Sequence, residues 1–104
     1  MTWQISITPA ARNMLLAIKD SSTRQALIRK IDGLIEHPDL QGKQLIGSLD
    51  RFRSVRAAGQ RYRIIYEILG QQVRVIVIAV GIRRDGDTKD IYKLTQKLIK
   101  AKII

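Results

Sequence analysis

The sequence predicts an α+β fold in which an N-terminal strand, a helical hairpin and a C-terminal helix pack on an antiparallel sheet. Apolar residues recur at helical spacing in the first third of the chain and again near its end. Between these two regions, short apolar runs alternate with turns that contain glycine. Because 104 residues is the usual length of one domain, we expect a single domain over residues 1–104.

The N-terminal third is predicted to form a strand and two helices. Residues 3–7 alternate apolar and polar side chains, which is the period of a half-buried strand. Thr8 and Pro9 are typical of a helix start, since threonine caps the first turn and proline lacks an N–H that would have no partner there. A second helix is predicted to begin at a capping box whose N-cap is Ser22, and to end before Pro38. The short connection between the helices predicts a hairpin.

The middle of the chain is predicted to form a three-stranded meander. After a loop-like segment over residues 39–50, strands are expected over 52–57, 61–69 and 73–82. The run over 73–82 is almost wholly apolar, which is typical of a central strand covered on both faces. The sheet residues expected in the core are Val55, Ile64, Ile76 and Ile78.

A last helix is predicted to begin at about residue 88. Ile91, Leu94 and Leu98 share one of its faces, at the spacing that buries an amphipathic helix against a sheet. Lysines occupy the rest of this segment and are expected to face solvent.

Composition narrows the class of partner. Nineteen Lys and Arg against nine Asp and Glu give a formal net charge of +10, which favours an anionic partner such as nucleic acid. The chain has no cysteine, so disulfides and thiolate metal sites are excluded, and its one histidine cannot supply a zinc site on its own. No apolar run has the length of a membrane span and no signal peptide precedes the fold, so we expect a cytoplasmic protein with no membrane contact.

The candidate functional side chains are arginines and a tyrosine. Seven arginines follow the predicted sheet: Arg53, Arg56, Arg61, Arg63, Arg74, Arg83 and Arg84. A guanidinium group has a fixed charge and a fork of donors that fits phosphate oxygens, so it can stabilise a phosphorane. Tyr92 can transfer a proton or stack on a base, and the first role needs cations nearby to stabilise the tyrosinate. No phosphate-binding glycine loop and no Ser/His/Asp set is present. These residues support a basic nucleic-acid-binding domain and leave catalysis open.

The segment RSVRAAGQRYRIIYEI, the following VRVIVIAVGIRR and the downstream Tyr92 resemble the RelE/ParE superfamily of bacterial toxins. The pieces that carry the resemblance are Tyr-Arg-Ile-Ile-Tyr over residues 62–66 and Val-Gly-Ile-Arg over 80–83, and the preceding helical hairpin also fits. The resemblance implies a fold like that of RelE and of microbial ribonucleases. For the RelE branch it implies an endoribonuclease that cuts messenger RNA in the ribosomal A site. The 2′-hydroxyl attacks the neighbouring phosphate there, without a metal.

The resemblance also implies roles for four residues. Arg63, in the Tyr-Arg motif, and Arg83, after Val-Gly, are expected to stabilise charge on the phosphate. Arg56 is expected to assist leaving-group or proton-transfer chemistry. Tyr92 is expected to act as a base or as a stacking platform, although residues 84–90 are longer than the usual spacing of the family before this tyrosine.

At one position the sequence departs from the family pattern. The family places two basic residues two apart on the first hairpin strand, and here these positions hold Ser54 and Arg56. Arg53 or Arg61 can supply the charge that Ser54 lacks. The residues expected to contact RNA besides the four above are Arg53, Ser54, Arg61 and Arg84.

The same residues are compatible with two other functions. A ParE-type toxin poisons DNA gyrase on the same scaffold, and a non-catalytic basic module only binds nucleic acid. Taken singly, Arg63 can pair with Glu67, Arg83 can cap a loop and Tyr92 can pack against the sheet edge. Both toxin interpretations imply a cognate antitoxin protein, whose acidic or amphipathic segment covers the apolar and basic surface.

Overall fold

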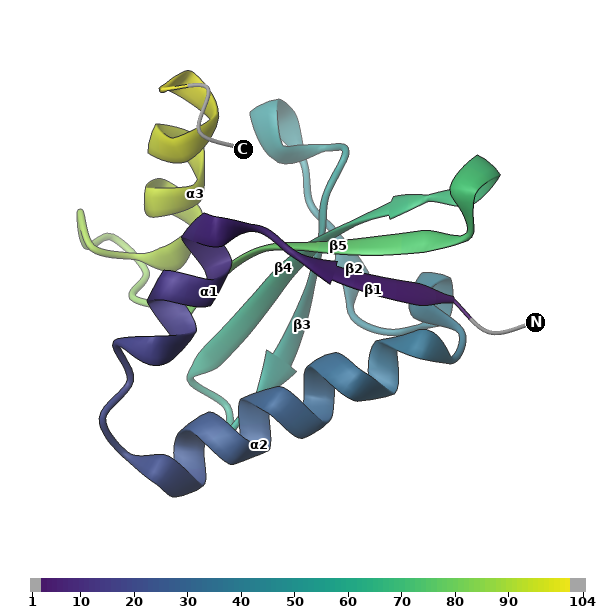
Figure 1. Cartoon of the computed structure of the whole chain (residues 1–104). Helices are drawn as coiled ribbons and strands as arrows, with labels where there is room; N and C mark the ends of the chain where they lie inside the picture. The colour runs from purple at the N-terminus through teal and green to yellow at the C-terminus, as the bar shows by residue number, and fades with distance from the viewer. Residues whose placement is uncertain (1–2, 102–104) are drawn as a thin grey trace.

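A five-stranded mixed sheet of order β1-β5-β4-β3-β2 forms the centre of the protein, as the computed structural model of residues 3–101 shows (Figure 1). The strands are β1 (Gln4–Ile7), β2 (Lys43–Gln44), β3 (Arg53–Ala57), β4 (Tyr62–Leu69) and β5 (Arg74–Ile82). β3, β4 and β5 form the predicted antiparallel meander, and their bounds agree with the prediction to about one residue. The apolar strand β5 lies between two neighbours, as its composition indicates.

Two strand pairings were not predicted. β1 joins the sheet parallel to β5, with Ile5 opposite Val75, so the sheet is mixed rather than antiparallel. β2 lies in the segment expected to be a loop, and it pairs antiparallel with β3, with Lys43 opposite Ser54. Alternation identifies a strand but not its partner, and a two-residue strand is too short to show any alternation.

The helices are α1 (Pro9–Leu16), α2 (Ser21–Asp32) and α3 (Ile91–Lys100). α1 begins as predicted, with the hydroxyl oxygen of Thr8 accepting from the Ala11 N–H at 3.1 Å. For α2 the predicted N-cap was wrong. Asp20, and not Ser22, caps this helix by accepting from the Thr23 N–H at 3.1 Å, and the Ser22 hydroxyl itself donates to the Asp20 carboxylate. A carboxylate suits this position because the helix dipole is positive there.

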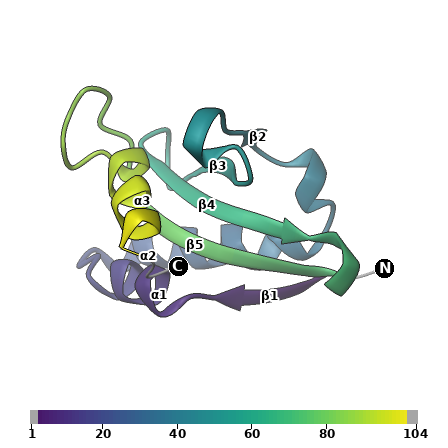
Figure 2. The ribbon, with the colours of Figure 1, turned by 90° about the horizontal axis from the view of Figure 1, so that it is seen from above.

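Each face of the sheet carries its own hydrophobic cluster. α1 and α2 cover one face, and α3 with residues 45–52 covers the other, as the two views show (Figures 1 and 2). Ile64 and Tyr66 belong to the first cluster and Ile65 to the second. A register shift opposite Ile65 and Tyr66 puts two consecutive residues of β5 into the second cluster. Of the expected core residues, Val55, Ile64 and Ile78 are buried, and Ile76 is half-buried against the second cluster.

The C-terminal helix begins later than the expected residue 88. Its first residue is Ile91, which is fully buried against the sheet, and residues 84–90 form a loop that Asp90 closes. Among residues 3–101, none of the helices combines the length and the apolarity that crossing a membrane requires.

Candidate active site

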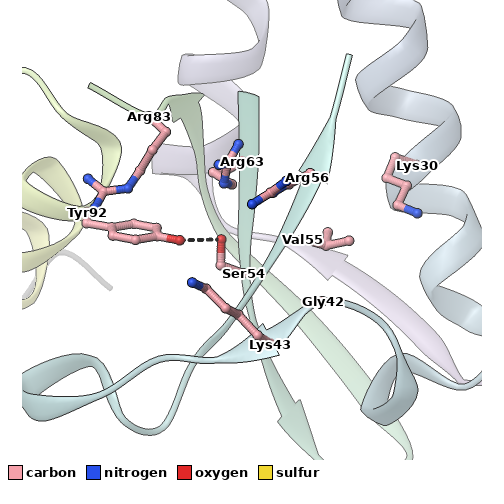
Figure 3. Close-up of a pocket in the computed structure, with 9 residues that line it drawn as sticks. All are labelled: Lys30, Gly42, Lys43, Ser54, Val55, Arg56, Arg63, Arg83 and Tyr92. Atoms are coloured by element: carbon pink, nitrogen blue, oxygen red, sulfur yellow. Dashed lines mark hydrogen bonds between the residues drawn. The ribbon is translucent and has the colours of Figure 1, made fainter. Parts of the chain in front are cut away.

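A pocket of about 440 Å³ opens beside β3 and β4 (Figure 3). It is lined by Lys30, Gly42, Lys43, Ser54, Val55, Arg56, Arg63, Arg83 and Tyr92. These residues come from α2, the β2 segment, β3, β4, the end of β5 and the first turn of α3. Five of the described lining residues are basic and none is acidic, so the pocket attracts an anion.

Arg56 and Arg63 face each other across β3 and β4. Like charges directly opposite in a sheet destabilise it, so this pairing is unfavourable unless an anion sits between them. Both arginines donate hydrogen bonds to Gln60. Its side-chain oxygen accepts from Arg56 at 3.0 Å, and its backbone carbonyl accepts from Arg63 at 2.6 Å. Within residues 3–101 neither arginine forms an ion pair. Glu67, the carboxylate expected to pair with Arg63, lies 3.7 Å from Arg51 instead. Both guanidinium groups therefore keep their full charge for a ligand.

Arg83 is fixed by two carboxylates. It donates to the buried carboxylate of Asp90 and lies 3.4 Å from that of the exposed Asp85. The hydrogen bond to Asp90 raises the pKa of Arg83. Burial opposes ionisation of Asp90, but hydrogen bonds from Arg83 and from the Arg84 N–H outweigh it and hold the pKa of Asp90 below its ordinary value of 3.8. Arg83 is therefore held in place by Asp90, and nearby carboxylates offset part of its positive charge.

Tyr92 reaches the pocket from the first turn of α3. Its hydroxyl donates to the Ser54 hydroxyl at 2.9 Å (Figure 3). The guanidinium carbon of Arg83 lies 4.2 Å from the centre of the ring, within the range of a cation–π contact. One face of the phenol is therefore covered by Arg83, while the hydroxyl end points to β3. The long loop over residues 84–90 does not displace Tyr92, because Asp90 anchors the start of the helix.

The structure brings together five of the eight predicted site residues: Ser54, Arg56, Arg63, Arg83 and Tyr92. The other three lie elsewhere. Arg53 does not line the pocket, because its guanidinium group donates to the carbonyls of Gln41 and Gly42. Arg61 lies exposed in the turn before β4. Arg84 lines a separate depression between α1 and α3. Neither Arg53 nor Arg61 supplies the charge that Ser54 lacks.

Two pocket lysines were missed by the sequence reasoning. Lys30 lies three residues after Leu27 and four before Leu34, both buried, so helical spacing alone could have placed it beside the packed face of α2. Lys43 gives no such signal. It enters the pocket because β2 pairs with β3, and that pairing joins residues that no local pattern connects.

Fold and pocket together define a small basic α+β protein whose pocket gathers arginines, lysines and a phenol. A family model described as the ParE toxin of a type II toxin–antitoxin system, parDE, matches residues 5–86. Over 68 residues the chain is 31% identical to the mRNA interferase toxin RelE of Escherichia coli K12, and the match spans 64% of this chain and 70% of that protein. The chain belongs to the RelE/ParE superfamily of type II toxin–antitoxin toxins.

Solved structures confirm the expected fold. A double arginine-to-alanine variant of E. coli toxin RelE in the free state superposes with a TM-score of 0.73 at 22% identity, covering 95% of this chain and 99% of that one. The RelBE2 toxin–antitoxin complex of Mycobacterium tuberculosis gives 0.72 at 24% identity, covering 82% and 95%. Arg56, Arg63 and Arg83 lie inside the region that the family model matches, and Tyr92 lies beyond it.

Proposed function

We propose that this protein is an mRNA interferase, the toxin of a type II toxin–antitoxin system, which inhibits translation by cutting messenger RNA on the ribosome. The observation that carries the proposal is the convergence of Arg56, Arg63, Arg83 and Tyr92 on one pocket. The likeness to the mRNA interferase toxin RelE supports the same activity. A protein that acts on ribosomes works in the cytoplasm.

The reaction is a transfer of the phosphodiester from one oxygen to another. The 2′-oxygen of a nucleotide bonds to the adjacent phosphorus while the bond to the next 5′-oxygen breaks. A base must take the 2′-proton, and Tyr92 is the pocket residue able to do so. Because Arg83 covers one face of its ring, we assign Tyr92 to proton transfer rather than to stacking.

The arginines stabilise charge in the transition state. Arg63 and Arg83 contact the non-bridging phosphate oxygens, where negative charge grows. Arg56 hydrogen-bonds to the leaving 5′-oxygen; a guanidinium does not lose its proton in proteins, so Arg56 stabilises that oxygen without protonating it. This route needs no metal ion, because guanidinium groups supply the positive charge.

A cognate antitoxin is the second proposed partner. Similar folds occur in toxin–antitoxin complexes such as RelBE2. Large apolar side chains remain exposed on this chain, with Leu16 at 62%, Leu40 at 76% and Ile46 at 87%. An amphipathic antitoxin segment with acidic residues would cover such apolar surface and the basic pocket together.

A ParE-type gyrase poison is the second candidate function, because the family model carries the ParE description. One fold can host both activities. A gyrase poison does not need cations and a phenol gathered in one pocket, so the pocket favours RNA cleavage.

Induced expression with mapping of messenger 5′ ends tests the proposal. The wild type should produce new ends within codons and stop translation, while Arg63→Ala with Tyr92→Phe should do neither. Arg83→Ala is a poorer test on its own, since it leaves the buried Asp90 carboxylate without its cation. DNA-damage signalling without new ends would indicate the gyrase poison. Salt-sensitive RNA binding with no product and no toxicity would indicate a binding module.

A further inference from the structure

We propose that Lys43 supplies a cation at the Tyr92 end of the pocket, where it lies opposite Ser54 of β3. The inference rests on the proposed RNA cleavage and adds a residue to it. Lys43 stands outside the sequence motifs that point to the site. It is assigned by its position across the sheet.

Strand pairing places Lys43 beside the phenol. Lys43 is directly opposite Ser54 in the β2–β3 pair, and Ser54 holds the hydroxyl of Tyr92. Directly opposed residues project to the same face of a sheet, with Cβ atoms about 5 Å apart. Figure 3 shows the Lys43 amino group directed toward the Tyr92 hydroxyl and Ser54. Lys43 also lines the adjoining depression of about 540 Å³, together with Tyr92 and Arg83, so it stands at the junction of the two.

The other cations of the pocket serve different positions. Arg83 lies over the face of the Tyr92 ring, and two carboxylates balance its charge. Arg56 and Arg63 lie further along the β3–β4 hairpin and donate hydrogen bonds to Gln60. Figure 3 shows Lys30 on the far side of the pocket from Tyr92. Lys43 makes no ion pair with any carboxylate of residues 3–101.

The short strand that carries Lys43 is held firmly. Arg53 donates to the Gly42 carbonyl at 3.2 Å, and the Leu45 N–H donates to the Phe52 carbonyl at 3.0 Å. Gly42 has φ of +62°, and the space beside its Cα is filled by the Ser54 carbonyl. The fixed backbone keeps the ammonium group of Lys43 within reach of the Tyr92 end of the pocket.

The chemistry that follows involves Lys43 without consuming it. Its ammonium group stabilises Tyr92 as a tyrosinate and donates to a phosphate oxygen. The tyrosinate takes the 2′-proton as the 2′-oxygen bonds to phosphorus and the bond to the 5′-oxygen breaks. The leaving 5′-oxygen takes a proton from water, and the hydroxide formed takes the proton from the Tyr92 phenol, which restores the tyrosinate. Lys43 keeps its own proton throughout.

Single-turnover cleavage of messenger RNA in the ribosomal A site, measured against pH, tests the inference. Lys43→Met keeps the aliphatic stem and should cut about 10²-fold more slowly, with the rate rising only at higher pH than in the wild type. Lys43→Arg should recover most of the rate. Lys19→Ala, an exposed lysine outside the pocket, is the matched control and should cut like the wild type.

The outcomes separate this inference from the proposed function. If the wild type cuts and Lys43→Met cuts at the same rate, Lys43 has no role although the function stands. A slower Lys43→Met with an unchanged pH profile assigns Lys43 to structure alone and also overturns the inference. A folded wild type that never cuts overturns both. Because Lys43 is exposed, the melting temperatures of its variants should match that of the wild type, and Lys43→Arg provides a second reading if Lys43→Met does not fold.

Discussion

Ser54 and Tyr92, 38 residues apart in the sequence, are joined by a hydrogen bond of 2.9 Å between their hydroxyl groups. This bond ties the first turn of α3 to β3 and fixes the phenol at one end of the basic pocket. Arg83 holds the same ring from its face. The position of Tyr92 is therefore determined by two contacts, one at its oxygen and one at its ring.

Removing only the hydroxyl of Tyr92 separates these two contacts. Tyr92→Phe keeps the ring under Arg83 and should lower cleavage by about 10²- to 10⁴-fold, the usual contribution of a general base. The lost hydrogen bond should reduce the free energy of unfolding by about 1 kcal/mol. Ribosome-dependent cleavage and urea unfolding measure the two effects. Tyr62→Phe is the control, since Tyr62 packs with the first cluster on the other face; equal loss in both variants would contradict the assignment.

We expect Arg56 to lower the stability of the folded protein while it increases the rate of RNA cleavage. Its guanidinium faces that of Arg63, and opposed like charges in a sheet cost up to about 1 kcal/mol. Arg56→Gln should therefore raise or leave unchanged the melting temperature while cleavage falls. Added salt should stabilise the wild type more than the variant, because it screens the repulsion. A variant that is both less stable and fully active would refute this account.

Asp90 is predicted to make stability sensitive to acid. Its pKa is lower in the folded protein than its ordinary 3.8, so its contribution is present above that pH and is lost as the pH falls through the folded value. Asp90→Asn should be less stable than the wild type at pH 7 but lose less stability between pH 5 and pH 2. Urea unfolding of both proteins across this pH range measures the difference in stability.

The comparison for Asp90 needs two other carboxylates. Asp32→Asn, at the exposed end of α2, should keep the full acid sensitivity of the wild type. Some sensitivity should also survive in Asp90→Asn, because the hydrogen bond from the Thr23 side chain lowers the pKa of Asp20 in the same direction. Identical acid profiles for the wild type and Asp90→Asn would show that the ion pair with Arg83 is not what stabilises Asp90.

Gly42 and Gly47 offer a matched test of the β2 segment. Both have positive φ, +62° and +64°, but only at Gly42 would a Cβ collide with the Ser54 carbonyl, while Gly47 has open space. Gly47→Ala should cost about 1 kcal/mol of backbone strain. Gly42→Ala adds the collision and should cost about 3 kcal/mol. It should also slow cleavage, since it displaces the strand that carries Lys43. Equal losses in urea unfolding would contradict the close packing of β2 on β3.

The sequence predicts what is local and misses what depends on long-range pairing. The period of apolar residues located α1, α2 and the three strands of the meander, because burial of one face follows directly from the spacing. The parallel partner of β1 and the existence of β2 depend on contacts between distant segments, so no periodicity reveals them. For the same reason Lys43 was missed, whereas Arg56 and Arg63 were named from the resemblance to the RelE/ParE superfamily, and strand pairing places them opposite each other.

Arg53, which was predicted to contact RNA, lies outside the pocket. The carbonyls of Gln41 and Gly42 hold its guanidinium group, and these contacts join β3 to a distant segment that no strand pattern predicts.

The walls of the pocket span the chain from Lys30 to Tyr92, and β1 is completed only by β5. A nascent chain therefore has no finished pocket until its last helix has left the exit tunnel. A chain that stops short of Asp90 and α3 therefore has neither the phenol of Tyr92 nor the Asp90 carboxylate that fixes Arg83.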